Sequence, residues 1–276
     1  MNRFAEVAAD VYVLRFPVLD VNATLVVGEE AAVVVDTLST DAQAGELLAA
    51  VRGITPLPLV LVNTHAHFDH CYGNAVLADD CPGGGIWAHE ATATTLRERG
   101  ESLQREQYVE WLPTDPELAE GLAAVSLRPP DRTVHTLSTM DIGGRALELR
   151  HFGRGHTDGD LVVSVPDADV LLAGDLIEQG APPSFGDAYP LDWPETVAEM
   201  LQLTLPTTVV VPGHGHPVDV DFVRAQHEEL TTLAWLIRDG HADGAAIEAV
   251  AAKAPFDRKT ALVAVQRGYA ELAGRI

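Results

Sequence analysis

The sequence predicts a layered α/β protein, and three observations support that prediction. Short β-branched runs alternate along the chain with Ala- and Leu-rich stretches of helical periodicity. Hydrophobic residues make up 47% of the chain, which is enough for a sizeable core. Aromatic residues make up only 6%, so aliphatic side chains must fill that core. At 276 residues, we expect one domain over 1–276 with a helical C-terminal segment over 218–276.

The individual elements follow from apolar runs and helix signals. Apolar and β-branched runs predict strands at 11–18, 24–27, 32–35, 57–62, 146–152, 161–165, 170–173 and 208–211. Helical periodicity predicts helices at 42–51, 91–107, 116–125, 194–203 and over most of 219–274. Pro116 and Pro194 stand where a first-turn proline is favoured, because a helix start leaves its first N–H groups unpaired. The proline-rich stretch Gly180–Trp193 is long for a connector, so we expect a functional loop there.

Charge and composition exclude several classes of function. The chain has 18 basic and 41 acidic side chains, so its formal net charge is −23. A surface this negative repels phosphate groups, so we expect no nucleic acid and no membrane partner. Charged residues interrupt the segment Met1 to Pro17 and no apolar run approaches the ~20 residues of a membrane span, so we expect no export signal. With only Cys71 and Cys81, a disulfide framework is excluded and a cytoplasmic location is favoured.

Several predicted strands run directly into polar clusters. These clusters are His65–His70 after 57–62, His156 after 146–152, Asp175 after 170–173 and His214 after 208–211. In layered α/β folds ligands gather at one end of the strands, because loops converge there. The separate clusters can therefore share one site.

The sharpest local signal is Thr64-His65-Ala66-His67-Phe68-Asp69-His70. Imidazole and carboxylate groups are ligands that zinc takes at ~2.0–2.2 Å. A tight turn lets His65 and His67 face one point while Asp69 and His70 face a neighbouring one. One ion would use at most three of these side chains, whereas two ions would use all of them together with ligands from elsewhere.

Those further ligands are present, in ordered motifs along the chain. The motifs are His65-Ala66-His67-Phe68-Asp69-His70, Gly155-His156-Thr157, Gly174-Asp175 and Pro212-Gly213-His214-Gly215. In order and spacing they resemble the signature of the metallo-β-lactamase-fold hydrolase superfamily, from about Asn22 through Pro217. The resemblance implies the metallo-β-lactamase fold, a four-layer αββα sandwich, here followed by the helical C-terminal segment.

The resemblance also implies a dinuclear metal site. The first metal would be held by His65, His67 and His156, the second by Asp69, His70 and His214, and Asp175 would bridge both. The cofactors would be two divalent ions, zinc with iron or manganese as alternatives, which polarise water to hydroxide near neutral pH. Asp69 would be the catalytic residue that orients this hydroxide and moves its proton to the leaving group.

Other polar residues are expected to support the ligands. Asp36 ends a buried run, and a buried charge needs partners, so we expect it to bond the His65–His70 loop, with a plain turn residue as the alternative. Thr157 would hold loop geometry, and His89 would support the site or cap a helix from a strand end. Two further histidines, His151 and His216, are alternatives to His156 and His214, whose Gly-His-Thr and Gly-His-Gly settings favour them as ligands.

The substrate is expected to be a small carbonyl compound. Aromatic residues expected to line its site, with core packing as the alternative role, are Phe68, Trp111, Phe185, Tyr189 and Trp193. The loop 16–22 should also contribute. Because this surface is apolar with few cations, an ester, lactone or thioester is favoured over a phosphodiester.

Two other activities remain as alternatives. One is a mononuclear-iron oxidoreductase of the persulfide dioxygenase type, which resembles this family in much of its ligand set. The other is a β-lactam hydrolase, disfavoured because the zinc β-lactamases have Cys or Ser in place of Asp175 and often a nearby Lys, which Leu176 to Gln179 lack. The sequence leaves open the substrate, the metal, the oligomeric state and the role of the helix at 91–107.

Overall fold

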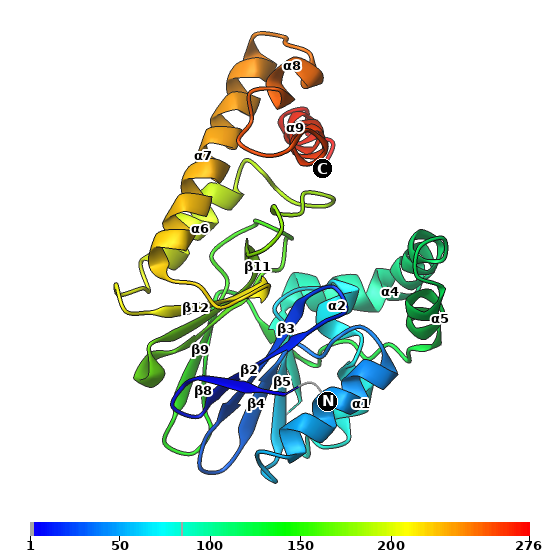
Figure 1. Ribbon diagram of the computed structural model, residues 1–276, viewed down its shortest axis with the longest axis vertical. Helices are drawn as coiled ribbons and strands as arrows, with labels where there is room; N and C mark the ends of the chain where they lie inside the picture. Colours follow the sequence, from blue (N-terminus) through cyan, green and yellow to red (C-terminus); the bar gives the residue numbers. More distant parts are fainter. Residues whose placement is uncertain (1–2, 84) are drawn as a thin grey trace.

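The computed structural model describes residues 3–83 and 85–276, so Met1, Asn2 and Gly84 of the predicted domain 1–276 lie outside the described residues. Its strands form two halves (Figure 1). The N-terminal half contains β1 (Ala5–Ala8), β2 (Val11–Phe16), β3 (Val21–Val27), β4 (Ala32–Val35), β5 (Leu59–Val62), β6 (Ile86–His89) and β7 (Arg132–Val134). The C-terminal half contains β8 (Leu137–Asp141), β9 (Ala146–Arg150), β10 (Val162–Val165), β11 (Val170–Glu178) and β12 (Val209–His214).

The two halves meet along a narrow seam. Strand β12 pairs with β3 at His214 and Val21. Beside this pair, the Asn22 side chain donates hydrogen bonds of 2.9 Å to the carbonyl oxygens of Pro212 and Gly215. Elsewhere the halves stack face to face, and side chains of both pack into one buried cluster that includes Val26 and Val33 on one side and Leu147, Val163 and Leu172 on the other. This cluster is the inner layer of a sandwich.

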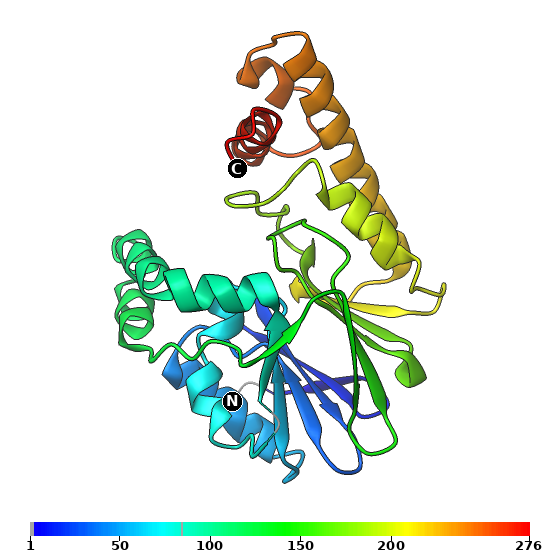
Figure 2. The ribbon, with the colours of Figure 1, turned by 180° about the vertical axis from the view of Figure 1, so that it is seen from behind.

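Helices cover both outer faces (Figures 1 and 2). Their bounds are α1 (Asp41–Arg52), α2 (Phe68–Cys71), α3 (Asn74–Ala78), α4 (Glu90–Trp111), α5 (Pro116–Ala124), α6 (Trp193–Leu201), α7 (Val220–Ala242), α8 (Ile247–Ala251) and α9 (Arg258–Leu272), with a 3₁₀ turn at Pro166–Ala168. Leucines of α1 and α3 pack on the N-terminal half, and apolar residues of α6 and α7 pack on the C-terminal half. The predicted αββα sandwich is therefore confirmed.

The C-terminal helices continue the outer layer on one side. Helix α7 starts beside β12 and extends past the sandwich, with α8 and α9 at its far end (Figure 1). A single buried cluster runs from Ile177 of β11 through Leu233 of α7 to Val265 of α9. The predicted helices all occur, and Asp115 caps α5 by accepting a hydrogen bond from the Leu118 N–H at 3.0 Å.

Some elements differ from the prediction. Strand β11 continues beyond residue 173 to Glu178, because its whole length is buried between neighbours. Strands β1, β7 and β8 were not expected, since they are short and partly exposed and carry no apolar run. Cys71 and Cys81 are both free and buried. Within residues 3–83 and 85–276, no helix is long and apolar enough to cross a bilayer.

Candidate metal centre

The polar loops that follow the strands meet at one end of the sandwich. Asn63 to His67 follow β5, and the short helix α2 carries Asp69 and His70 directly after them. His156 lies beyond the end of β9, and His214 ends β12. Segments about a hundred residues apart in the sequence therefore meet here, because loops converge at one end of the strands in layered α/β folds.

A first group of side chains contains His65, His67, His156 and Asp175, whose nearest ligand atoms all lie within 4.8 Å of one another. His67 Nδ1 lies 3.1 Å from His65 Nε2 and 2.9 Å from His156 Nε2. We call this group the first cluster. Two of its members come from the N-terminal half of the sandwich and two from the C-terminal half.

A second cluster contains Asp69, His70 and His214. The Nε2 atoms of His70 and His214 lie 3.3 Å apart. An Asp69 carboxylate oxygen lies 3.4 Å from His214 Nε2 and 3.7 Å from His70 Nε2. This cluster also draws on both halves of the sandwich.

Asp175 lies between the clusters. Its carboxylate oxygens are 3.3 Å from Nε2 of His156, 3.2 Å from Nε2 of His70 and 3.3 Å from Nε2 of His214. The side chain is buried, and its Oδ1 has no hydrogen-bond partner. Gly213 makes room for it, since a Cβ there would come within 1.7 Å of Oδ1.

Asp36 makes the contact with the His65–His70 loop that the sequence predicts. Its carboxylate accepts hydrogen bonds of 2.8 Å from the Thr64 N–H and from Thr64 Oγ1. The same carboxylate lies 2.8 Å from His70 Nδ1, which leaves the Nε2 of His70 free to face the second cluster. His214 is oriented in the same way, because its Nδ1 lies 2.8 Å from the Leu19 carbonyl oxygen.

Two acidic residues near the clusters were missed in the sequence. The Asp187 carboxylate lies 3.0 and 3.2 Å from His67 Nε2, on the side of the ring that faces away from the first cluster. The Glu178 carboxylate lies 4.0 Å from the His156 Nδ1, which has no hydrogen-bond partner. Burial, followed by the neighbouring Asp175, raises the pKa of Glu178 to about 8. The one available signal for Asp187 was its place in the long 180–193 loop.

The histidines ionise differently according to their neighbours. Burial lowers the pKa of His156 to about 4. Burial also opposes protonation of His67 and His214, yet Asp187 raises the pKa of His67 to about 9 and Asp175 raises the pKa of His214 to about 10. In the absence of a cation, protons on these two rings partly neutralise the carboxylates. A divalent ion would replace those protons.

The donor set fits divalent metal ions. Histidine nitrogens and carboxylates are zinc ligands, and a tetrahedral zinc ion with bonds of ~2.0–2.1 Å separates its ligand atoms by about 3.3 Å. The facing ring nitrogens in both clusters lie 2.9–3.3 Å apart. Without a cation, the buried Asp175 Oδ1 has no hydrogen-bond partner. A cation in each cluster would take these nitrogen and oxygen atoms as ligands.

The clusters form part of the wall of a cavity of about 850 Å³. His67, Asp69, His156, Asp175 and His214 line it from the strand ends. On the opposite side it is lined by one face of α4, which contributes Thr95, Arg99, Leu103, Glu106, Gln107, Glu110 and Trp111. Helix α4, whose role the sequence left open, is thus a wall of this cavity.

The aromatic residues expected at the substrate site divide into two groups. Phe68 and Trp111 line the cavity, with ring centroids 6.3 Å apart. For Phe185 and Trp193 the alternative, core packing, holds instead, because both are buried in the core cluster that α6 and α7 share, where Trp193 packs edge-on against His156. The expectation of a lining role was also wrong for Tyr189, which is not among the described residues that line the cavity. The Arg154 guanidinium lies over the Tyr189 ring, 4.2 Å from the ring centroid.

The remaining candidates lie outside the clusters. Thr157 holds the turn after His156, since its Oγ1 donates a hydrogen bond of 2.6 Å to Asp160. His89 ends β6 and caps α4 by accepting from the Ala91 N–H, and its ring stacks on that of His151 with centroids 3.9 Å apart. Neither His151 nor the second alternative, His216, belongs to a cluster.

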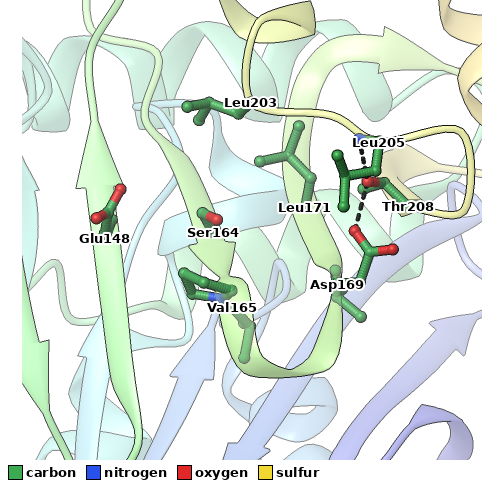
Figure 3. Close-up of a pocket in the computed structure, with 10 residues that line it drawn as sticks. Glu148, Ser164, Val165, Asp169, Leu171, Leu203, Leu205 and Thr208 are labelled. Carbon is green, nitrogen blue, oxygen red and sulfur yellow. Dashed lines mark hydrogen bonds between the residues drawn. The ribbon is translucent and has the colours of Figure 1, made fainter.

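A second cavity, of about 300 Å³, lies near the start of β11 (Figure 3). The shared cluster residue Asp175 lies toward the other end of this strand. Its acidic groups already have partners. Asp169 accepts hydrogen bonds from the hydroxyls of Thr207 and Thr208, and Glu148 pairs with Arg150. No histidine or cysteine is among its described lining residues, so this cavity offers no comparable chemistry.

The comparisons with known proteins agree with this geometry. The family described as "Metallo-beta-lactamase superfamily" matches residues 16–214. The chain is 27% identical over 158 residues to a metallo-beta-lactamase type 2 of Bacillus sp. (strain 170), covering 56% of this chain and 51% of that protein. It is 29% identical over 175 residues to acyl-coenzyme A thioesterase MBLAC2 of Gallus gallus, covering 58% of each. The chain thus spans about half the length of these curated relatives.

A structural comparison extends the likeness to the whole chain. The inverting sec-alkylsulfatase Pisa1 of Pseudomonas sp. superposes with a TM-score of 0.80 and 17% identity, covering 100% of this chain and 51% of that one. This likeness concerns the fold alone, and it includes the C-terminal helices. The family match spans most of the sequence and ends at the last predicted ligand, and it leads to one conclusion. The chain belongs to the metallo-β-lactamase superfamily, whose members are typically metal-dependent hydrolases.

Proposed function

We propose that the protein hydrolyses a small carbonyl substrate, an ester, lactone or thioester, with two divalent metal ions bound at the two clusters. The observation that supports this is the meeting of both clusters at Asp175, in the wall of the large cavity. The proposed ligands are those of the two clusters, with Asp175 shared. Zinc is the proposed metal, because the donor set is imidazole and carboxylate.

When bound, divalent ions polarise a carbonyl oxygen and make water acidic enough to act as a nucleophile near neutral pH. The protein's own groups provide orientation and proton transfer. Asp69 lines the cavity and lies beside His214, so its carboxylate can accept a proton from the attacking water and return it to the leaving group. Phe68 and Trp111 supply apolar surface for the substrate's body.

The charge of the cavity favours a neutral substrate. Among the described residues that line it, Arg99 is the one Lys or Arg, whereas Asp20, Glu106 and Glu110 are acidic. A phosphodiester would meet repulsion there without a compensating cluster of cations. This supports a carbonyl substrate over a nucleic acid.

A screen on metal-loaded protein tests the proposal. We expect hydrolysis of esters, lactones or thioesters that chelation abolishes and added zinc restores. Asp69→Asn should lose turnover and bind the second metal ion more weakly, so assaying it at saturating zinc separates the loss of proton transfer from the loss of metal. Oxygen uptake with a persulfide would instead support the iron oxidoreductase, and full activity after exhaustive chelation would rule out both.

β-Lactam hydrolysis is the second candidate, and the relative described as a metallo-beta-lactamase type 2 favours it. Two features oppose it. The shared position carries Asp175, and the residues after it are Leu176, Ile177 and Glu178, which provide no cation for a substrate carboxylate. Including β-lactams in the screen separates the two candidates.

A further inference from the structure

The loop between β11 and α6 places the Asp187 carboxylate beside His67, on the side of the ring that faces away from the first cluster. His67 turns its Nδ1 toward His65 and His156 and its Nε2 toward Asp187. A carboxylate that accepts a hydrogen bond from Nε2–H leaves the Nδ1 lone pair directed at the first cluster and holds the ring in one orientation. Asp187 therefore determines both the tautomer and the direction of His67.

The backbone at Asp187 is held from the C-terminal segment. Arg267 of α9 donates hydrogen bonds of 2.7 Å to the Asp187 carbonyl oxygen and 3.1 Å to the Ala188 carbonyl oxygen. The planar guanidinium presents donors in a fixed fork, which suits two neighbouring acceptors. Figure 2 shows this loop beside α9.

One turn along α9, a second side chain holds the other end of the loop. Glu271 accepts a hydrogen bond from the Leu191 N–H at 3.3 Å and lies 3.7 Å from Arg154. Arg154 also pairs with Asp192 at the start of α6. From the loop itself, the Tyr189 N–H donates to the Gly155 carbonyl oxygen at 2.8 Å, next to His156. The loop thus contacts the turns that carry two members of the first cluster.

We propose that Arg267 is a positioning residue for the first cluster, because it fixes the segment from which Asp187 orients His67. The C-terminal helices, which contribute no ligand, then control how tightly the first metal is held. This inference rests on the metal-binding role proposed above. A merely structural Arg267 would stabilise the fold and leave the metal affinity unchanged.

A double-mutant cycle separates these roles. Zn²⁺ affinity is measured by competition with a chromophoric chelator for the wild type, Asp187→Asn, Arg267→Met and the double variant, with the Tm of each metal-free protein. Each single variant should lose about tenfold to a hundredfold in affinity for one of two zinc equivalents. The double variant should lose little more, because both changes act on the same ring.

Controls make each outcome decisive. Arg238→Met removes a hydrogen bond to the Leu191 carbonyl oxygen of the same loop, farther from Asp187, and should keep the wild-type affinity. If Arg267→Met does not fold, Arg267→Lys serves, since it keeps the charge and loses the fork. Unchanged affinity in Arg267→Met or Arg267→Lys, or losses that add in the double variant, would overturn this inference alone. Failure of the wild type to bind zinc would overturn the proposed function with it.

Discussion

The two clusters reach similar geometry by different means. In the second cluster, His70 and His214 are oriented by groups from the N-terminal half of the sandwich, the Asp36 carboxylate and the Leu19 carbonyl. In the first cluster, His67 depends on Asp187 from a long loop, and His156 has no hydrogen-bond partner on its Nδ1. The sandwich thus orients the histidines of the second cluster, whereas in the first cluster it orients His65, whose Nδ1 lies 3.0 Å from Thr64 Oγ1, and a loop that packs onto it orients His67. Rigid support and metal retention should therefore differ between them.

Removal of the shared carboxylate should have the largest effect. Asp175→Ala takes away the carboxylate between the clusters, so we expect loss of both metal equivalents and of turnover. The loss of metal affinity should exceed the roughly hundredfold that is typical when a residue that only orients a metal ligand is changed. Metal analysis by mass spectrometry, together with the hydrolysis rate, measures it. Glu248→Ala, which removes an exposed acid on α8, is the matched control. Two equivalents retained by Asp175→Ala would remove the case for a shared ligand.

Single-cluster variants should separate the two sites. We expect His156→Ala to lose one equivalent from the first cluster and His214→Ala to lose one from the second. Cobalt substitution followed by absorption spectroscopy distinguishes which site remains. Identical spectra for both half-loaded variants would contradict the existence of two separate clusters.

Asp36→Asn should lower the metal affinity of the second cluster by less than Asp175→Ala does. The Asp36 carboxylate faces donors from Thr64 and a ring nitrogen of His70, and an amide NH₂ cannot accept from them. We expect a loss of about 1–3 kcal/mol in the free energy of unfolding, together with a lower affinity for the metal ion at the second cluster. Urea unfolding and zinc titration measure the two effects. An unchanged unfolding free energy would mean that the amide finds other partners.

In the metal-free protein, His214 and His156 should contribute opposite dependences of stability on pH on the two sides of pH 6.5. The pKa of His214 is about 10 in the folded protein, so its stabilising contribution is present below pH 6.5 and is lost as pH rises through 10. The pKa of His156 is about 4, so its contribution to stability is lost as the pH drops from 6.5 through 4, whereas Glu178, whose pKa is about 8, contributes in the opposite sense as the pH drops below 8. Urea unfolding of chelated protein at several pH values checks both limbs. Stability that rises steadily from pH 6.5 to 9.5 would contradict this assignment for the second cluster.

The smallest effect is expected at the cavity wall, away from both clusters. Trp111→Ala removes apolar surface that contacts Phe68, so KM should rise several-fold with little change in kcat, corresponding to about 1 kcal/mol. Trp235→Ala, on an exposed side chain of α7, is the control. A fall in kcat with constant KM would instead link α4 to the chemistry at the clusters.

The meeting of the clusters could be predicted because much of the signal is local. His65 to His70 form a dense motif, and Asp175 and His214 follow apolar runs, so strand-end convergence predicts that they share one site. The division of these residues between two metals came from the resemblance to the superfamily. Asp187 could not be predicted as a partner of His67, since 120 residues separate them and only the folded loop makes the contact.

Aromatic side chains illustrate a second limit of the sequence. Phe185 and Trp193 lie in a proline-rich loop region, as expected of a substrate site, yet both turn into the core. Apolar character is the same whether a ring faces a cavity or a core, so composition alone does not distinguish the two. The α4 residues show the converse. Arg99, Glu106 and Glu110 have the sequence pattern of a solvated helix face, yet they line the cavity.

The narrow seam between β3 and β12 has a mechanical consequence. Val21 and His214 form the one ladder pair between these described strands, beside the two hydrogen bonds that the Asn22 side chain donates across the junction, and each cluster takes its members from both sides of it. Ions bound at the clusters would therefore act as cross-links that resist shear between the halves. Metal occupancy and the rigidity of the whole sandwich would then rise and fall together, so that amide hydrogen exchange near the junction reports on loading.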